Sequence, residues 1–99
     1  MTTAERIESR LRQELAPVHL EILDESSKHV GHAGAAAGGG HFSCVVVSAA
    51  FHDRSTLERH RAVYRALGDL MKHEVHALAL QTLDPTEWAA RRDLAKLRS

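Results

Sequence analysis

The chain has little cysteine, no excess of either charge and no long apolar stretch, and each shortage excludes a class of protein. A single cysteine among 99 residues rules out a disulfide within the chain and is compatible with a reducing compartment. Thirteen basic and thirteen acidic side chains cancel, so the net charge indicates neither a nucleic-acid nor a membrane partner. No apolar run approaches the roughly 20 residues that span a bilayer, and residues 1–6 lack the pattern of a secretory signal. We therefore expect one small cytosolic domain over residues 1–99, with no membrane partner.

Histidine, by contrast, is abundant, with eight residues. Imidazole binds transition metals readily and changes its charge near neutral pH. Most of the eight are expected to be solvated surface side chains, so only those beside apolar segments are candidates for a site. Two of these come first: His29 follows the apolar run that ends at Asp24, and His76 begins a later apolar run.

The first predicted helix has clear ends. Thr2 and Glu5 form a capping-box pattern, which satisfies free amide groups at the start of a helix. Apolar side chains recur every four residues from Ile7 to Leu15 and predict one buried stripe. Pro17 is expected to end the helix.

Three apolar segments are predicted to be strands. Residues 18–24 roughly alternate apolar and polar side chains, as a half-buried strand does. Residues 42–48 are rich in valine and predict the central strand, and residues 75–80 predict a third. Residues 31–40 are almost all glycine and alanine, so we expect a flexible loop there.

Further helices are predicted after the central strand. Ser55 and Glu58 form a second capping box, and Gly68 is expected to break the following helix into two. Asp84, as the cap, and Pro85, at the first helical position, begin the last helix. The apolar face of the middle helix is expected to consist of Leu57, Tyr64, Leu67 and Met71.

Together these elements predict an α+β fold in the order α-β-β-α-α-β-α. The first two strands should be antiparallel, and the third, which follows a helical crossover, should run parallel to its neighbour. The helices are expected to pack on one face of this mixed three-stranded sheet, and the charged residues 91–99 to fray. Cys44 is expected to be a buried structural thiol. The expected core includes Leu11, Leu20, Val46, Leu67, Leu78 and Trp88.

Several segments occur together in an arrangement that resembles the BolA-like protein family. The resemblance covers about residues 7–88, and the predicted element order is similar to the class II KH-like fold of that family. No single segment is specific, but the combination is. The segments are Asp24-Glu25-Ser26-Ser27-Lys28-His29, His41-Phe42, Val47-Ser48-Ala49-Ala50-Phe51, Leu57-Glu58-Arg59-His60-Arg61-Ala62-Val63-Tyr64, His76-Ala77-Leu78-Ala79-Leu80 and Trp88.

The resemblance implies a non-enzymatic adaptor. BolA-like proteins are partners of monothiol glutaredoxins, with which they share a 2Fe–2S cluster. In the family, the histidine at the position of His76 is the common ligand, and a loop histidine, matched here by His29, marks one subfamily. The glutaredoxin would supply its own cysteine and glutathione, so we expect no cofactor in the isolated chain. We also expect the free chain to be a monomer.

Two other histidines remain candidates for the loop ligand. His32 stands in an H-x-x-H spacing with His29, which could bind zinc on a helix, but the surrounding glycines disfavour a helix. His32, or less easily His41, could replace His29 as a ligand. A structural role at the start of the central strand is the simpler interpretation of His41.

A DNA-binding transcriptional regulator is the alternative function. The predicted middle helix carries a basic cluster that could contact phosphates, and the BolA-like family is also known for transcriptional regulation. A solvated helix face or a protein-docking surface would explain the same pattern. The residues concerned are Arg54, Arg59, Arg61 and Arg65.

Overall fold

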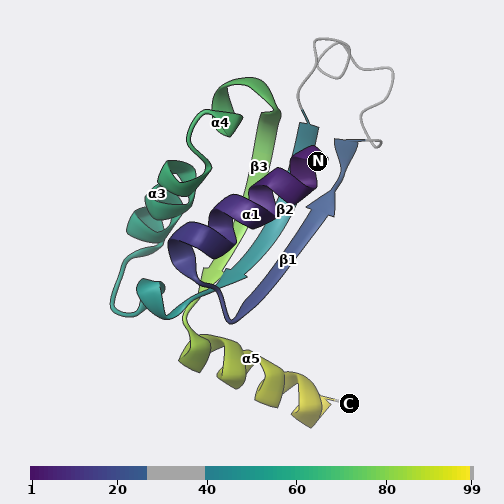
Figure 1. The fold of residues 1–99 in the computed structure, drawn as a ribbon. Coiled ribbons are helices and arrows are strands. Elements are labelled where there is room, and N and C mark those ends of the chain that lie inside the picture. Colours follow the sequence, from purple (N-terminus) through teal and green to yellow (C-terminus); the bar gives the residue numbers. More distant parts are fainter. Residues whose placement is uncertain (27–39, 99) are drawn as a thin grey trace.

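The computed structural model describes residues 1–26 and 40–98, and in this range it contains a three-stranded sheet with flanking helices (Figure 1). The predicted elements are all present, in the predicted order. They are α1 (Thr3–Leu15), β1 (His19–Asp24), β2 (Gly40–Val47), α3 (Thr56–Leu67), α4 (Leu70–His73), β3 (Val75–Leu83) and α5 (Pro85–Arg98). A short 3-10 turn that was not predicted, η2 (Ala49–Phe51), lies between β2 and α3.

The sheet has the predicted topology. Its strand order is β1-β2-β3, so β2 is central, as its valine-rich sequence indicated. β1 pairs with β2 antiparallel and β3 pairs with β2 parallel, which confirms the mixed sheet. Several strand ends differ from the prediction: β1 begins one residue later, β2 ends one residue earlier and β3 continues to Leu83. The start of β2 differs most, because Gly40 was expected in the loop but begins this strand. The Gly40 amide donates to the carbonyl oxygen of Glu74 at 2.8 Å, and this bond joins the start of β2 to the chain just before β3.

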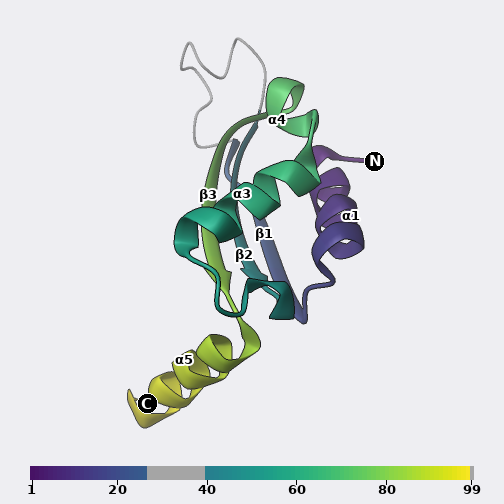
Figure 2. The ribbon, with the colours of Figure 1, turned by 90° about the vertical axis from the view of Figure 1, so that its left-hand side faces the viewer.

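Two helices cover one face of the sheet, and a third lies beyond its end. Figures 1 and 2 show α1 and α3 side by side on the same face, where the core lies. The last helix, α5, begins where β3 ends and projects away toward the opposite side (Figure 2). It stays helical to Arg98, and the fraying expected of residues 91–99 stays a prediction.

The core prediction holds in its main part. Leu11, Val46 and Leu67 are completely buried, and Leu20 and Leu78 pack against them while partly buried. Trp88 lies outside this core, although it was expected to join it. Its indole stacks on the ring of His19 at the start of β1, with centroids 4.5 Å apart and planes 19° from parallel.

The helix ends follow the predicted chemistry. Thr2 and Ser55 are both N-caps of complete capping boxes, with Glu5 and Glu58 as the returning side chains. Gly68 ends α3 with φ +55, a conformation that glycine adopts without strain. Each of these three helix boundaries therefore has a hydrogen-bonding or backbone cause in the structure.

The predicted apolar face of α3 is wrong in part. Leu57 and Tyr64 are 59% and 41% exposed, and the buried stripe runs instead through Arg59, Val63 and Leu67. These three lie four residues apart, so they share a helix face. The error arises because an arginine occupies an inward position, which a search for apolar residues does not select.

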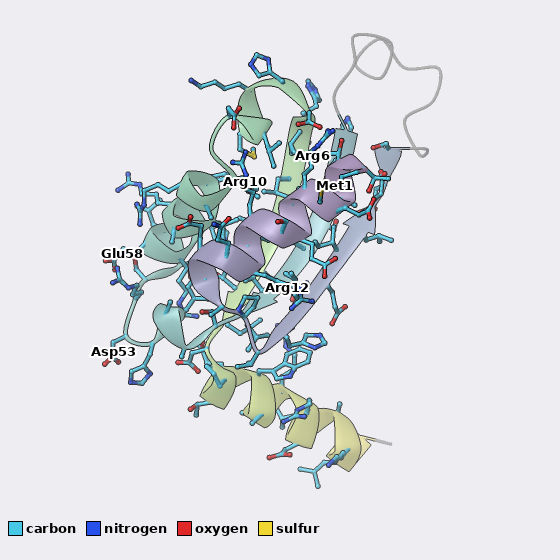
Figure 3. All side chains as sticks on the ribbon, viewed as in Figure 1. Met1, Arg6, Arg10, Arg12, Asp53 and Glu58 are labelled. Carbon is cyan, nitrogen blue, oxygen red and sulfur yellow. The ribbon has the colours of Figure 1, made fainter. Side chains whose placement is uncertain are left out.

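Arginines on α1 tie this helix to the region around α4 (Figure 3). Arg6 forms an ion pair with Glu74, and Arg10 donates to the carbonyl oxygen of Leu67 at 3.1 Å. Exposed ion pairs contribute little stability individually. The bond from Arg10 matters more for geometry, because it satisfies a carbonyl group at the end of α3.

Candidate functional site

A β-bulge gives His76 its position in the fold. Between the pairs Gly40–Val75 and His41–Ala77, β3 advances two residues while β2 advances one, and His76 is the extra residue. A bulge breaks the strict alternation of side chains along a strand. Val75 therefore remains in the core, while His76 is exposed at the edge of the sheet.

The bulge brings His76 beside His41. The buried side chains of β2 are Phe42 and Cys44, so alternation directs His41 and Ser43 to the sheet face away from α1 and α3. The two imidazole rings are tilted by 47°, with centroids 5.2 Å apart. The structure thus places His41, the less favoured candidate ligand, beside His76, the principal candidate.

This separation fits two imidazoles that share a metal ion. Two imidazoles bound to one tetrahedral ion, each with a metal–nitrogen distance of about 2.1 Å, have ring centroids about 5 Å apart. Histidine pairs also ligate one iron of some 2Fe–2S clusters. Within residues 1–26 and 40–98, no group of three or more histidine, cysteine or acidic side chains could hold a metal ion. The described histidine pair therefore provides at most part of a ligand set.

The backbone around His41 is held on both sides. Its amide donates to Ser26 Oγ at 3.1 Å, and its carbonyl oxygen accepts from the amide of Glu25 at 2.7 Å. Ser43 donates to the Glu25 carboxylate on the same side. These contacts join the end of β1 to β2 and hold the backbone of His41 at a defined position. His41 lines a shallow hollow of about 260 Å³ together with Glu25, Ser43 and Ala77.

The other candidate ligands, His29 and His32, lie outside the described residues. The described residues on either side of that segment, Ser26 and Gly40, lie at the end of the sheet where β2 and β3 begin. Asp24 pairs with Phe42, and Ser26 accepts from the amide of His41. The roles of His29 and His32 as ligands stay predictions.

The four arginines do not form one surface. Arg54, Arg61 and Arg65 are exposed, whereas Arg59 is 8% exposed. The Arg59 guanidinium donates to the carbonyl oxygens of Arg54 and Thr82 at 2.9 and 3.1 Å and lies over the Phe51 ring. Because these contacts occupy it inside the fold, a nucleic-acid surface would have to consist of the other three.

Cys44 is buried, as the sequence predicted. Only 3% of it is exposed, and burial raises the pKa of its thiol to about 11. A thiol with so high a pKa carries almost no thiolate at neutral pH, and the thiolate is the form that binds metals. Cys44 is therefore a packing residue of the central strand. No described helix is long and apolar enough to cross a membrane.

Comparison with known proteins places this architecture in one family. A family model described as BolA-like protein matches residues 11–87. The chain is 42% identical over 93 residues to the DNA-binding transcriptional regulator BolA of Escherichia coli (strain K12), which covers 94% of this chain and 86% of that protein. Among solved structures, the BolA domain of SufE1 from Arabidopsis thaliana has a TM-score of 0.77 and 39% identity, with 88% of this chain and 96% of that chain covered. A bol-like protein from Babesia bovis also has a TM-score of 0.77, with 30% identity and with 93% and 95% covered. The chain therefore belongs to the BolA-like protein family.

Proposed function

We propose that this chain is a non-enzymatic adaptor that binds a monothiol glutaredoxin and shares a 2Fe–2S cluster with it, for cluster trafficking or iron sensing. The observation that carries the proposal is the pair His41–His76, whose rings lie 5.2 Å apart at an exposed sheet edge. Two imidazoles supply part of a ligand set, and the glutaredoxin would supply a cysteine and a bound glutathione. In this scheme the cluster is cargo that passes between two proteins.

His76 is the fixed ligand of the proposed site. The bulge holds it at the start of β3, between the core residue Val75 and a regular run of pairs with β2. A side chain in such a position needs little reorganisation to bind, because its backbone is already ordered. Imidazole ligands also leave a cluster less negative than thiolates do, which raises its reduction potential.

The second ligand has two candidates, which different observations favour. The resemblance to the histidine-loop subfamily favours His29, whereas the geometry favours His41, because its ring lies beside that of His76. His32 is a third candidate, next to His29 in sequence. Variants of each histidine can separate these candidates, because loss of a ligand changes the electronic spectrum of the cluster more than loss of a neighbouring side chain does.

The test uses the full chain mixed with a monothiol glutaredoxin that carries its 2Fe–2S cluster, followed by visible absorption and circular dichroism. We expect the wild-type chain to change the spectrum on binding and His76→Ala to abolish that change. His29→Ala and His41→Ala, compared one by one, identify the second ligand by the larger loss. His73→Ala is the matched control, because His73 is an exposed histidine on the neighbouring α4. If His76→Ala gave the wild-type spectrum and affinity, the ligand assignment would be wrong.

DNA binding is the second candidate function. The printed name of the Escherichia coli relative describes a DNA-binding transcriptional regulator, and Arg54, Arg61 and Arg65 are exposed at and along α3. Contacts to phosphates release counterions, so binding of this kind weakens steeply as salt rises. Fluorescence anisotropy with duplex DNA over a salt series tests this function. Replacing Arg54, Arg61 and Arg65 together by alanine should lower both the affinity for DNA and the steepness with which that affinity falls as salt rises. Arg59 is expected to affect DNA binding only through its contribution to folding.

A further inference from the structure

The histidine pair lies on the face of the sheet opposite α1 and α3, which we call the open face. Alternation along β2 directs His41 to this face, and the ring of His76 lies beside that of His41. Figure 2 shows α1 and α3 on the other side of the sheet, whereas α5 begins at the far end of the strands. A protein that binds a cluster held by both imidazoles therefore covers part of the open face.

The core side of the same edge is tied to α1. Glu74, which directly precedes β3, accepts from the Thr3 hydroxyl at 3.3 Å and forms an ion pair with Arg6. Its carbonyl oxygen accepts from the amide of Gly40 at 2.8 Å. Because these bonds join α1 to the start of both strands on the core side, they leave the open face as the side from which a partner reaches the imidazoles.

The strand register shows which side chains lie next to the pair on this face. Alternate residues of a strand share a face and each residue rises about 3.3 Å, so successive rows of side chains lie about 7 Å apart. His41 and Ala77 are paired and form the first row, beside His76. The second row, paired across β1, β2 and β3, consists of Leu23, Ser43 and Ala79.

The second row is uncharged and largely exposed. Leu23 is 57% exposed and Ala79 is exposed, while Ser43 between them is half-buried and donates to Glu25. Ser43 and Ala79 line both the hollow beside His41 and a larger groove of about 580 Å³. The two small side chains leave room for a side chain of another protein, and Leu23 offers that side chain an apolar contact.

The polar groups of the third row already have partners within the chain. Glu21 bonds the imidazole of His19 at 2.7 Å, and Gln81 accepts from Arg91 of α5 at 2.8 Å. Trp88, which stacks on the same imidazole, bounds the open face at this end. The apolar surface available to a partner is therefore the second row, between α5 and the histidine pair.

We propose that the second row is the docking surface for the protein that carries the cluster, which lies across the open face with apolar side chains on Leu23 and Ala79. This surface rests on the function proposed above, because it belongs to the same partner. Continuity with the histidine pair identifies the occupant: a protein whose cysteine and glutathione meet the cluster there has its next contacts about 7 Å away, on the second row. The partner surface that fits is apolar, because an unpaired charge buried against these side chains is costly.

Titration of a cluster-loaded monothiol glutaredoxin with the full chain, followed by circular dichroism, measures both the affinity and the spectrum at saturation. Leu23→Ser and Ala79→Glu should each raise the dissociation constant at least about tenfold. The spectrum at saturation should stay that of the wild type, because no ligand is changed. Leu23→Met keeps an apolar side chain of similar size and should bind as the wild type does. Leu57→Ser is the matched control, because Leu57 is 59% exposed but lies on α3, on the other side of the sheet.

The outcomes separate the docking surface from the ligand assignment. If Leu23→Ser and Ala79→Glu bound as tightly as the wild type, and the wild type still changed the cluster spectrum, the surface would be wrong and the ligands would stand. Docking through the exposed arginines of α3 would instead weaken steeply with salt and ignore Leu23→Ser, which would also overturn the surface. A wild-type chain that left the spectrum unchanged would refute the proposed function, and the docking surface with it.

Discussion

Arg59 and Glu87 join two helices: a guanidinium nitrogen of Arg59, on α3, lies 2.7 Å from a carboxylate oxygen of Glu87, on α5. The same nitrogen donates to the carbonyl oxygen of Thr82, the penultimate residue of β3. Glu87 also accepts from the amide of Asp84 and so caps its own helix. The pair thus fixes where β3 ends and α5 begins.

We predict that Arg59→Ala lowers the free energy of unfolding by about 1–3 kcal/mol, because it leaves the carbonyl groups of Arg54 and Thr82 without their charged donor. Urea denaturation measures this loss. The control is Arg61→Ala, an exposed neighbour on the same helix, which should change stability by no more than about 0.5 kcal/mol. Equal effects of the two variants would contradict the structural role of Arg59.

Leu67→Ala should cost about 2–5 kcal/mol, because Leu67 is completely buried between α3 and the rest of the core. Thermal and urea unfolding both measure it. Leu57→Ala is the comparison on the same helix, where 59% exposure predicts a small change. If the two leucines had similar effects, the observed orientation of α3 would be wrong.

Gly40→Ala should destabilise the protein by about 1–3 kcal/mol, because an added Cβ would overlap the Phe42 ring and lie 2.9 Å from Ser26 Oγ. The Phe42 ring is buried and has little freedom to move. A double-mutant cycle with Phe42→Leu is the appropriate control. The smaller side chain should reduce the cost of Gly40→Ala, and a cost that did not depend on Phe42 would exclude this overlap as the cause.

Stability should fall as the pH drops below about 4.5, through the capping carboxylates. The amide of Asp84 holds the pKa of Glu87 below its ordinary value of 4.5, with help from Arg59, and the amide of Glu87 does the same for Asp84, whose ordinary value is 3.8. A lowered pKa in the folded state adds stability above the unfolded pKa, which is lost as pH falls through the folded value. Urea midpoints between pH 7 and pH 3 should therefore decrease, and Glu87→Gln should flatten that dependence. An unchanged pH profile in Glu87→Gln would rule out this carboxylate as a contributor.

The proposed shared cluster should be less stable at pH 6 than at pH 8, values that lie on either side of the ordinary histidine pKa of about 6.5. Imidazole must be neutral to bind a metal, so protons compete with the cluster. Circular dichroism of the complex with glutaredoxin over this range measures the effect. The glutaredoxin alone, whose ligands are a cysteine and glutathione in this proposal, is the control and should show less pH dependence.

Local chemistry allowed most of the fold to be predicted from the sequence. Thr2, Ser55 and Asp84 begin helices because their side chains accept backbone hydrogen bonds, which is a property of three or four adjacent residues. Gly68 ends α3 because of its own backbone freedom. The valine-rich run of β2 identifies a strand buried by its neighbours, and hence the centre of the sheet.

Features that depend on distant residues could not be predicted in this way. The bulge at His76 depends on the register between β2 and β3, and either register fits the alternation of apolar residues. Arg59 lies inward because Thr82 and Glu87, more than 20 residues away, satisfy its charge. The sequence therefore identified His76 as the principal candidate and His41 as a possible substitute ligand, but not that their rings lie side by side.

The stack of Trp88 on His19 makes the intrinsic fluorescence of this protein sensitive to the contact between α5 and β1. Trp88 is the only tryptophan in the chain, so all indole emission comes from the point where α5 leaves the sheet. An imidazole in contact with the indole affects its emission, and any partner that moves α5 or covers β1 alters that contact. Docking of glutaredoxin or of DNA, where it changes this contact, can therefore be followed in the unlabelled protein by one signal that arises from a single pair of rings.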